Sequence, residues 1–188
     1  MPRTVALIYG FGEGPWHGKQ FTKRLTSADF TVVTDTAAAD IVIAHSAGVF
    51  YVPELHRHQV VMLINPSYWP GKHTPIQMAQ KIGLDIIYNG LRHPLYLLQK
   101  TAHNIFYICR DFPRTREIIR RSKNFELAKA VTHHKTIVVR NHADTWLTPN
   151  LQKLQTAFPT LRIHHVPGEH DDCWLHPDRY VDLLQSDI

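Results

Sequence analysis

Short runs of consecutive apolar residues recur along the chain, separated by segments in which apolar residues follow a helical spacing. The apolar runs predict strands over residues 4–9, 30–34, 41–45, 60–64, 136–140 and 161–166. Runs that are apolar at every position are typical of strands buried on both faces of a parallel sheet. Because helical segments lie between most of the runs, we expect an α/β fold in which a mostly parallel sheet is flanked by helices.

The segments between the strands predict helices that cover the sheet, over residues 19–27, around 150–158 and from about 177 to 184. Phe21 and Leu25 lie about one helical turn apart in the first of these helices and share one face. The residues after 45, beginning with Ala47 and Gly48, suit the first turn of a further helix that packs back onto the preceding strand.

Between about residue 67 and residue 131 the pattern changes to helical, aromatic-rich and basic segments. These segments predict helices over residues 74–82, 86–106 and 114–131. We interpret this part of the chain as a helical cap insertion that lies over one edge of the sheet. The 188 residues then form a single domain, 1–188, which is long enough to bury a substantial core.

Composition places the chain among ordinary globular proteins, with 44% hydrophobic and 20% charged residues. Two cysteines, Cys109 and Cys173, give no disulfide framework and favour a reducing compartment. The apolar part of the N-terminal segment is too short for a signal peptide, and no apolar run approaches membrane-spanning length. We therefore predict a cytoplasmic protein.

The formal net charge of +5 raises the question of nucleic-acid binding. The basic residues concentrate in one segment, at Arg110, Arg114, Arg116, Arg120, Arg121 and Lys123. The sequence has no zinc-finger spacing, glycine-rich RNA-binding signature or clear helix-turn-helix, so we predict no nucleic-acid partner. A solvated helix face is the favoured interpretation, and peripheral contact with anionic lipid stays open.

Candidate chemistry begins where the strand at 41–45 runs into Ser46. A strand that turns directly into a helix brings two backbones together, so only small residues fit beside the turn, and Ala44 and Gly48 stand at those positions. The turn then presents the serine hydroxyl at its tip, as in a nucleophile elbow. Ala44 replaces the first glycine of the usual G-x-S-x-G pattern. Taken alone, the stretch is also typical of a helix N-cap.

Two later loops follow predicted strands and carry an acid and a histidine. Asp144 lies in the loop 141–149, and His170 lies in the loop 167–172. Because parallel strands end at one edge of the sheet, Ser46, Asp144 and His170 are expected to converge there. Their order, nucleophile, then acid, then histidine, is the order that this architecture uses.

These motifs resemble the α/β-hydrolase superfamily over nearly the whole chain outside the insertion. The matching segments are the loop 9–12 at the oxyanion-loop position, the elbow 44–48, the acid loop 141–149 with its Thr-Pro end, and the histidine loop 168–170. Tyr9 departs from the family's usual histidine. The short connection between the strand at 30–34 and the elbow implies a pared-down core.

The resemblance implies a role for each matching residue. Ser46 would be the nucleophile, His170 its general base, and Asp144 the acid that orients the imidazole. The backbone N–H groups of Phe11 and Ala47 would form the oxyanion hole. The implied activity is hydrolysis of a carboxylic ester through an acyl-enzyme, with thioester or amide cleavage as variants and with neither cofactor nor metal.

The insertion also bears on the substrate. Its apolar and aromatic residues, such as those at 68–69 and 105–108, favour a small-molecule ester with an apolar acyl or aromatic group. The same residues would equally serve to hold the cap to the core. Acyl transfer by the same three residues and a non-enzymatic binding protein on a hydrolase scaffold are the alternative functions.

Several residues have competing interpretations. Asp171 or Asp172 could be the working acid, although Asp171 is too near His170 in sequence to orient it easily. His45 is expected to pack beside its strand, and His17 to be a solvated loop residue. A dense group could ligate zinc: His164, His165, His170, Asp172 and His176. Because successive side chains of a strand point to opposite faces, His164 and His165 would not face the same metal. The H-E-x-x-H motif is also absent, so we predict no metal site.

Overall fold

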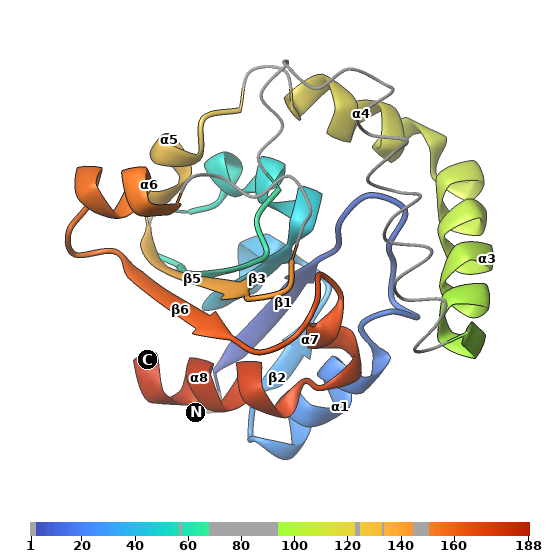
Figure 1. The fold of residues 1–188 in the computed structure, drawn as a ribbon, viewed down its shortest axis with the longest axis horizontal. Helices are drawn as coiled ribbons and strands as arrows, with labels where there is room; N and C mark the ends of the chain where they lie inside the picture. The colour runs from blue at the N-terminus through green and yellow to red at the C-terminus, as the bar shows by residue number, and fades with distance from the viewer. Residues whose placement is uncertain (1–2, 57, 68–93, 123–124, 133, 145–150) are drawn as a thin grey trace.

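The computed structural model describes residues 3–56, 58–67, 94–122, 125–132, 134–144 and 151–188, and strands alternate with helices through most of them (Figure 1). The strands are β1 (Thr4–Ile8), β2 (Thr31–Val33), β3 (Ile41–His45), β4 (Val60–Ile64), β5 (Lys135–Asn141) and β6 (Arg162–Val166). The helices are α1 (Lys19–Ser27), α3 (Pro94–Arg110), α4 (Phe112–Ser122), α5 (Leu127–Thr132), α6 (Leu151–Ala157), α7 (Asp172–Leu175) and α8 (Asp178–Asp187), with 3-10 helices η1 (Thr36–Ala38) and η2 (Ser46–Glu54).

The six strands form one sheet in the order β2-β1-β3-β4-β5-β6. Every pairing in this sheet is parallel, and in the centre Ile8 of β1 pairs with Ala44 of β3 while His45 pairs with Ile64 of β4. The predicted fold class is therefore confirmed, and all six strands lie where the apolar runs predict them. Since the strands are parallel, their carboxyl ends share one edge of the sheet.

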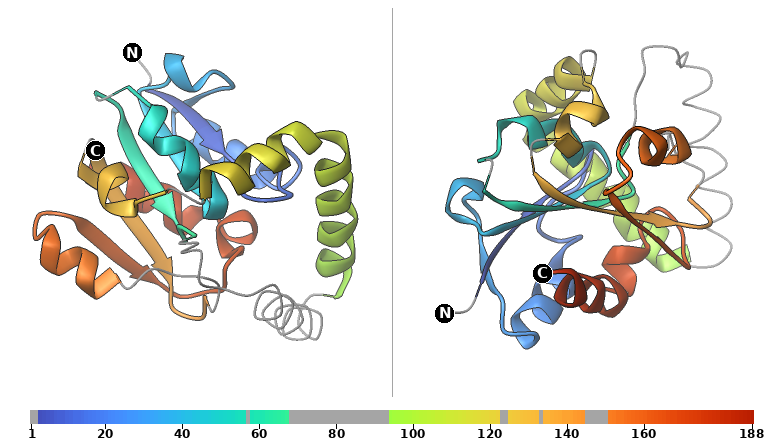
Figure 2. Two further views of the ribbon diagram at one scale, coloured as in Figure 1. Left: turned by 90° about the horizontal axis from the view of Figure 1, so that it is seen from above. Right: turned by 90° about the vertical axis from the view of Figure 1, so that its left-hand side faces the viewer.

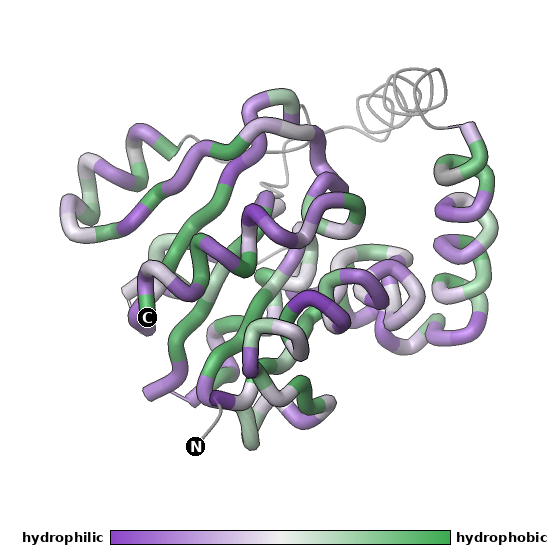
Figure 3. The backbone as a smooth tube through the Cα atoms, turned by 90° about the horizontal axis from the view of Figure 1, so that it is seen from below, coloured by the Kyte–Doolittle hydropathy of each residue, from purple (hydrophilic) through white to green (hydrophobic). Residues whose placement is uncertain are grey.

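Helices cover both faces of the sheet (Figure 2). Side chains of alternating strand residues enter two separate cores, so that Val42 and Ala44 pack with η2, α5 and α6, whereas Ile41 and Ile43 pack with α1, α7 and α8. The central strands β3 and β4 are accordingly hydrophobic along most of their length, and green segments run through the middle of the molecule in Figure 3. Burial on both faces is the physical reason that these two strands are apolar at consecutive positions instead of at every second one.

The helices differ from the prediction in three places. The segment after Ser46 is a 3-10 helix instead of an α-helix. The predicted helix at 114–131 is two helices, α4 and α5, and the short α7 was not predicted. The helix predicted at 86–106 is described from Pro94, which suits the first turn of a helix because proline lacks the N–H group that is unpaired there. The helix predicted at 74–82 lies outside the described residues.

The helices between β4 and β5 occupy two kinds of position. Ile118 of α4, with Leu127 and Ala130 of α5, belongs to the buried core on one face of the sheet. In contrast, α3 lies away from the sheet (Figures 1 and 2) and contacts the loop after β1, where Asn104 approaches Gly12. The division into a domain with a cap insertion at about 67–131 stays a prediction.

None of the helices in the described ranges is long and apolar enough to cross a membrane.

Candidate active site

Ser46 follows the last residue of the central strand β3 and begins η2. Its φ angle of 51° lies in the left-handed region, which a non-glycine residue adopts only when the surrounding structure enforces it. The neighbouring backbone explains the small residues of the elbow, because a Cβ atom at Gly48 would lie 2.5 Å from the carbonyl oxygen of Ile8. The close approach of β1 to η2 therefore requires glycine at this position.

The structure brings Ser46, His170 and Asp144 together from the ends of β3, β6 and β5. The Nε2 atom of His170 lies 2.9 Å from the Ser46 Oγ atom, and its Nδ1 atom lies 3.1 Å from the Asp144 Oδ1 atom. The Asp144 carboxylate accepts a hydrogen bond from the Nδ1–H group of His170. Nε2 then carries no proton and can accept a hydrogen bond from the Ser46 hydroxyl. The side chain of Asp144 is fully buried and that of His170 is 10% exposed. The imidazole thus bridges a hydroxyl and a carboxylate at the shared edge of the sheet.

Hydrogen bonds from the backbone and from the Asn65 amide hold the loop that carries Asp144 against the loop that carries His170. The backbone N–H of Ala143 donates to the carbonyl of Gly168 over 3.0 Å. Asn65, which follows β4 with a φ angle of 45°, donates from Nδ2 to the carbonyl of His170 over 2.7 Å and accepts the backbone N–H of Asn141 over 2.9 Å. Asn65 therefore ties the acid loop and the histidine loop to the neighbouring strand.

The loop after β1 lies directly against the elbow. A Cβ atom at Gly10 would lie 3.0 Å from the Cβ of Ser46, and Phe11 follows Gly10 in the chain. Ala47 follows Ser46 directly and is buried. The two residues expected to supply oxyanion-hole donors therefore belong to the two segments that meet at this contact, while their role stays a prediction.

No protein-family model matches the sequence, and no curated protein matches it either. Solved structures do match over almost its full length. They include an enol-lactonase from Burkholderia xenovorans (TM-score 0.70, 14% identity, 100% of this chain and 91% of that chain). A carboxylesterase of the thaumarchaeon Nitrososphaera gargenis gives a TM-score of 0.67 at 12% identity, over 98% of this chain and 89% of the other. An N-formylmaleamic acid deformylase from Pseudomonas putida gives 0.65 at 13% identity, over 98% and 92% of the two chains.

The chain has the α/β-hydrolase fold. At these identities the likeness concerns the architecture, and it agrees with the parallel sheet and with the position of Ser46 after a central strand. In an α/β-hydrolase fold, the elbow, the acid loop and the histidine loop all lie at the carboxyl edge of the sheet.

The two alternative acids, Asp171 and Asp172, interact with other residues. Asp171 forms an ion pair with Lys100 of α3. Burial would raise the pKa of Asp171, but the charge of Lys100 and then that of His170 lower it below its ordinary value. Asp172 accepts a hydrogen bond from Arg179 over 3.1 Å and one from the Tyr180 hydroxyl over 3.3 Å. Asp144 is therefore the one of these three acids that contacts Nδ1 of His170 in the described structure.

Two histidines differ from expectation. His17 is buried instead of solvated, because Nδ1 accepts the backbone N–H of Gly14 over 3.2 Å and α3 covers the loop. Burial lowers the pKa of His17 below its ordinary value. His45 was expected only to pack beside its strand; it is fully buried against Trp174, and both of its ring nitrogens are hydrogen-bonded, one of them to Glu13.

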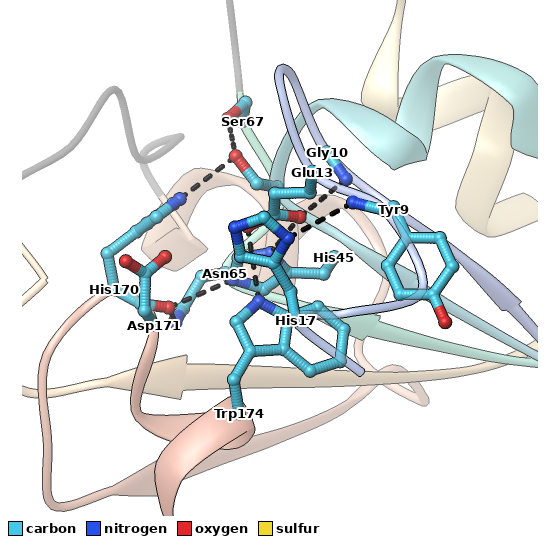
Figure 4. A network of polar contacts seen from close by, with 12 residues as sticks. Tyr9, Gly10, Glu13, His17, His45, Asn65, Ser67, His170, Asp171 and Trp174 are labelled. Carbon is cyan, nitrogen blue, oxygen red and sulfur yellow. Dashed lines mark hydrogen bonds and ion pairs between the residues drawn. The ribbon is translucent and has the colours of Figure 1, made fainter. Parts of the chain in front are cut away.

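Three polar contacts around the site were not predicted from the sequence: those of Asn65, of Glu13 and of Ser67. The Ser67 Oγ atom lies 2.9 Å from the Ser46 Oγ atom, so the Ser67 hydroxyl can donate to Ser46 Oγ when Ser46 directs its own proton to His170 (Figure 4). These residues belong to no motif that was identified in the sequence. Their position in a short polar segment after an apolar run is the one sequence feature that they share.

The five residues considered above as alternative zinc ligands do not form one cluster in the described part of the chain. His164 is hydrogen-bonded to Asp187 over 2.7 Å, whereas the ring of His165 lies beside that of His142, with ring centroids 5.6 Å apart and the planes tilted by 31°. In the described part of the chain, three side chains could hold a metal between them, His45, His170 and Asp171. The ring nitrogens of both histidines are already hydrogen-bonded to protein groups, so this arrangement fits a hydrogen-bond network better than a metal centre.

Proposed function

We propose that this chain is a serine hydrolase that cleaves a carboxylic ester through an acyl-enzyme at Ser46. The continuous hydrogen-bonded path from the Ser46 hydroxyl through His170 to the buried carboxylate of Asp144 carries the proposal. A serine hydroxyl is a poor nucleophile at neutral pH and needs a base within hydrogen-bond distance. His170 is at that distance, and Asp144 is placed to fix its tautomer.

The reaction follows from these positions. His170 Nε2 removes the proton as the Ser46 Oγ attacks the ester carbonyl, and Asp144 stabilises the imidazolium that forms. The backbone N–H groups of Phe11 and Ala47 bind the oxyanion of the tetrahedral intermediate. Collapse of the intermediate breaks the ester bond, and the imidazolium returns the proton to the leaving alkoxide. Water, activated by the same histidine, then hydrolyses the acyl-enzyme and releases the acid.

The substrate class is inferred from the surroundings of the site. Tyr107 and Ile108 of α3 pack against Gly14 and Gly12 in the loop after β1, the loop that adjoins Ser46, so apolar and aromatic side chains lie near the site. We infer a small-molecule ester with an apolar acyl or aromatic group, with α3 acting as part of a cap. The named structural neighbours act on a lactone, on esters and on an N-formyl group, which supports acyl chemistry at this site. The predicted cytoplasmic location is compatible with such a substrate.

Two other functions use the same scaffold. An acyltransferase would pass the acyl group from Ser46 to an acceptor other than water, and a binding protein would hold a ligand at the same site without chemistry. The hydrogen-bonded path through His170 favours catalysis over binding alone, because binding does not require an oriented base.

Covalent labelling tests the proposal. Native protein, Ser46→Ala and the control Ser186→Ala, in which an exposed serine on α8 is changed, are treated with a fluorophosphonate probe. We expect labelling of the native protein and of Ser186→Ala, and none of Ser46→Ala. Hydrolysis of p-nitrophenyl butyrate by the same three proteins separates a hydrolase from a binding protein. Folded native protein that neither reacts with the probe nor hydrolyses the ester would refute the proposal.

A further inference from the structure

A buried polar network joins Gly10, Glu13, His45, His170 and Trp174 (Figure 4). The Glu13 side chain accepts a hydrogen bond from the backbone N–H of Gly10 over 2.6 Å and one from the indole N–H of Trp174 over 3.1 Å. Its Oε2 atom also lies 2.9 Å from Nδ1 of His45. Glu13 is 6% exposed and His45 is fully buried, so these contacts are removed from solvent.

The hydrogen-bond partners fix the charge of His45. Nδ1 faces the carboxylate of Glu13, and Nε2 lies 2.9 Å from the carbonyl oxygen of His170. With Glu13 ionised, both partners are acceptors, so both ring nitrogens carry protons and the ring is an imidazolium. Burial would lower the pKa of His45, but the charge of Glu13, the contacts with Cys173 and the hydrogen bond to Glu13 together raise the pKa well above its ordinary value. Burial would likewise raise the pKa of Glu13, whereas the charge of His45 and its hydrogen bond lower it.

This ion pair connects the two loops that the proposed reaction depends on. Glu13 holds the N–H of Gly10, the residue that lies against Ser46 and precedes Phe11. His45 holds the carbonyl of His170, the proposed base. The oxyanion loop and the histidine loop are thus joined through two side chains, although they lie far apart in the sequence.

The negative charge of Glu13 has a second consequence. The rings of His45 and His170 have centroids 4.9 Å apart, so an unbalanced charge on His45 would oppose the imidazolium that forms on His170 during the reaction. The Glu13 carboxylate cancels that charge. A buried ion pair adds little net stability compared with apolar side chains of similar size, so stability alone does not account for this arrangement.

We propose that Glu13 and His45 are positioning residues, which fix the positions of the oxyanion loop and of His170 relative to Ser46. This inference rests on the serine hydrolase function proposed above. Neither residue touches the substrate. They act through the backbone N–H of Gly10 and the backbone carbonyl of His170.

Glu13→Gln tests the inference because a glutamine has the same shape but cannot accept hydrogen bonds from Gly10, Trp174 and His45 at once. Its single amide oxygen accepts from Gly10 or from Trp174, and its NH₂ group then meets another donor. Complete loss of one oxyanion-hole donor costs about 10²- to 10³-fold in kcat, and we expect a loosened loop to cost about 10- to 100-fold. The KM for p-nitrophenyl butyrate should change less than about threefold, since ground-state binding does not use the oxyanion hole.

Glu126→Gln is the matched control, because Glu126 forms an exposed ion pair with Lys129 on α5, and it should leave kcat and KM unchanged. Thermal unfolding establishes that each variant is folded. A folded Glu13→Gln protein whose kcat falls less than about tenfold, or whose loss lies in KM alone, would overturn the inference.

Nitrogen-15 NMR of the histidine side chains provides a measurement that does not depend on the variant folding. At pH 7.5 the native protein should show both ring nitrogens of His45 protonated, and a neutral ring would overturn the inference. Ser46 labelling by the fluorophosphonate separates the two proposals. If native protein is labelled while Glu13→Gln has native kcat, only the positioning role fails; if native protein is not labelled, the hydrolase function fails.

Discussion

Replacing Asp144 by asparagine removes one charge from the site and keeps the size of the side chain. The Asp144 side chain is fully buried, and its Oδ1 atom lies 3.1 Å from Nδ1 of His170. An asparagine can present its NH₂ group to Nδ1, which moves the ring proton to Nε2. A protonated Nε2 faces the Ser46 hydroxyl over 2.9 Å and cannot accept its proton.

The expected loss is large because two effects combine. The base is held in the wrong tautomer, and the imidazolium of the transition state loses a carboxylate that solvent cannot replace at a buried position. The equivalent change in a serine protease lowers kcat by about 10⁴-fold, and we expect a similar factor here. That factor corresponds to about 5 kcal/mol of activation free energy. The loss should appear in kcat, with KM nearly unchanged.

The assay is hydrolysis of p-nitrophenyl butyrate by native protein, Asp144→Asn and Asp171→Asn. Asp171 is the matched control because it is buried beside His170 but pairs with Lys100. We expect Asp171→Asn to lower kcat by less than about tenfold, since its carboxylate does not contact Nδ1 of His170 in the described structure. A fall of less than about 10²-fold in folded Asp144→Asn, or a larger loss in Asp171→Asn, would refute the assignment of the acid.

Two further predictions concern stability. Gly48→Ala should lower the free energy of unfolding by about 1–3 kcal/mol, because its Cβ would lie 2.5 Å from the backbone oxygen of Ile8. Differential scanning calorimetry should show a melting temperature lower by about 2–12 °C, and the control Gly18→Ala, whose Cβ would meet the movable ring of Tyr9, should lose less. Burial lowers the pKa of His17, so below about pH 6.5 the unfolded chain binds a proton that the folded chain does not, and stability falls. Urea unfolding at about pH 7.5 and pH 5 should show a smaller decrease for His17→Gln than for native protein, and equal decreases would contradict this explanation.

Much of the fold was predictable from local pattern. Each strand buried on both faces is an apolar run, and the helix over 19–27, with Phe21 and Leu25 in its buried face, was predicted with the bounds that the structure gives it. The exact form of η2 and the break between α4 and α5 were not predictable, because they depend on how the chain packs against the sheet.

The parallel α/β architecture and the order of Ser46, Asp144 and His170 were predictable from the amino-acid sequence. They were predictable because a strand buried on both faces is a run of consecutive apolar residues, and because parallel strands end at one edge of the sheet. The folded structure was needed to show that Asp144 and not Asp171 lies at Nδ1 of His170, that His17 is buried, and that Glu13 pairs with His45. These contacts join residues from separate loops, and no local periodicity records which polar groups meet when those loops fold together.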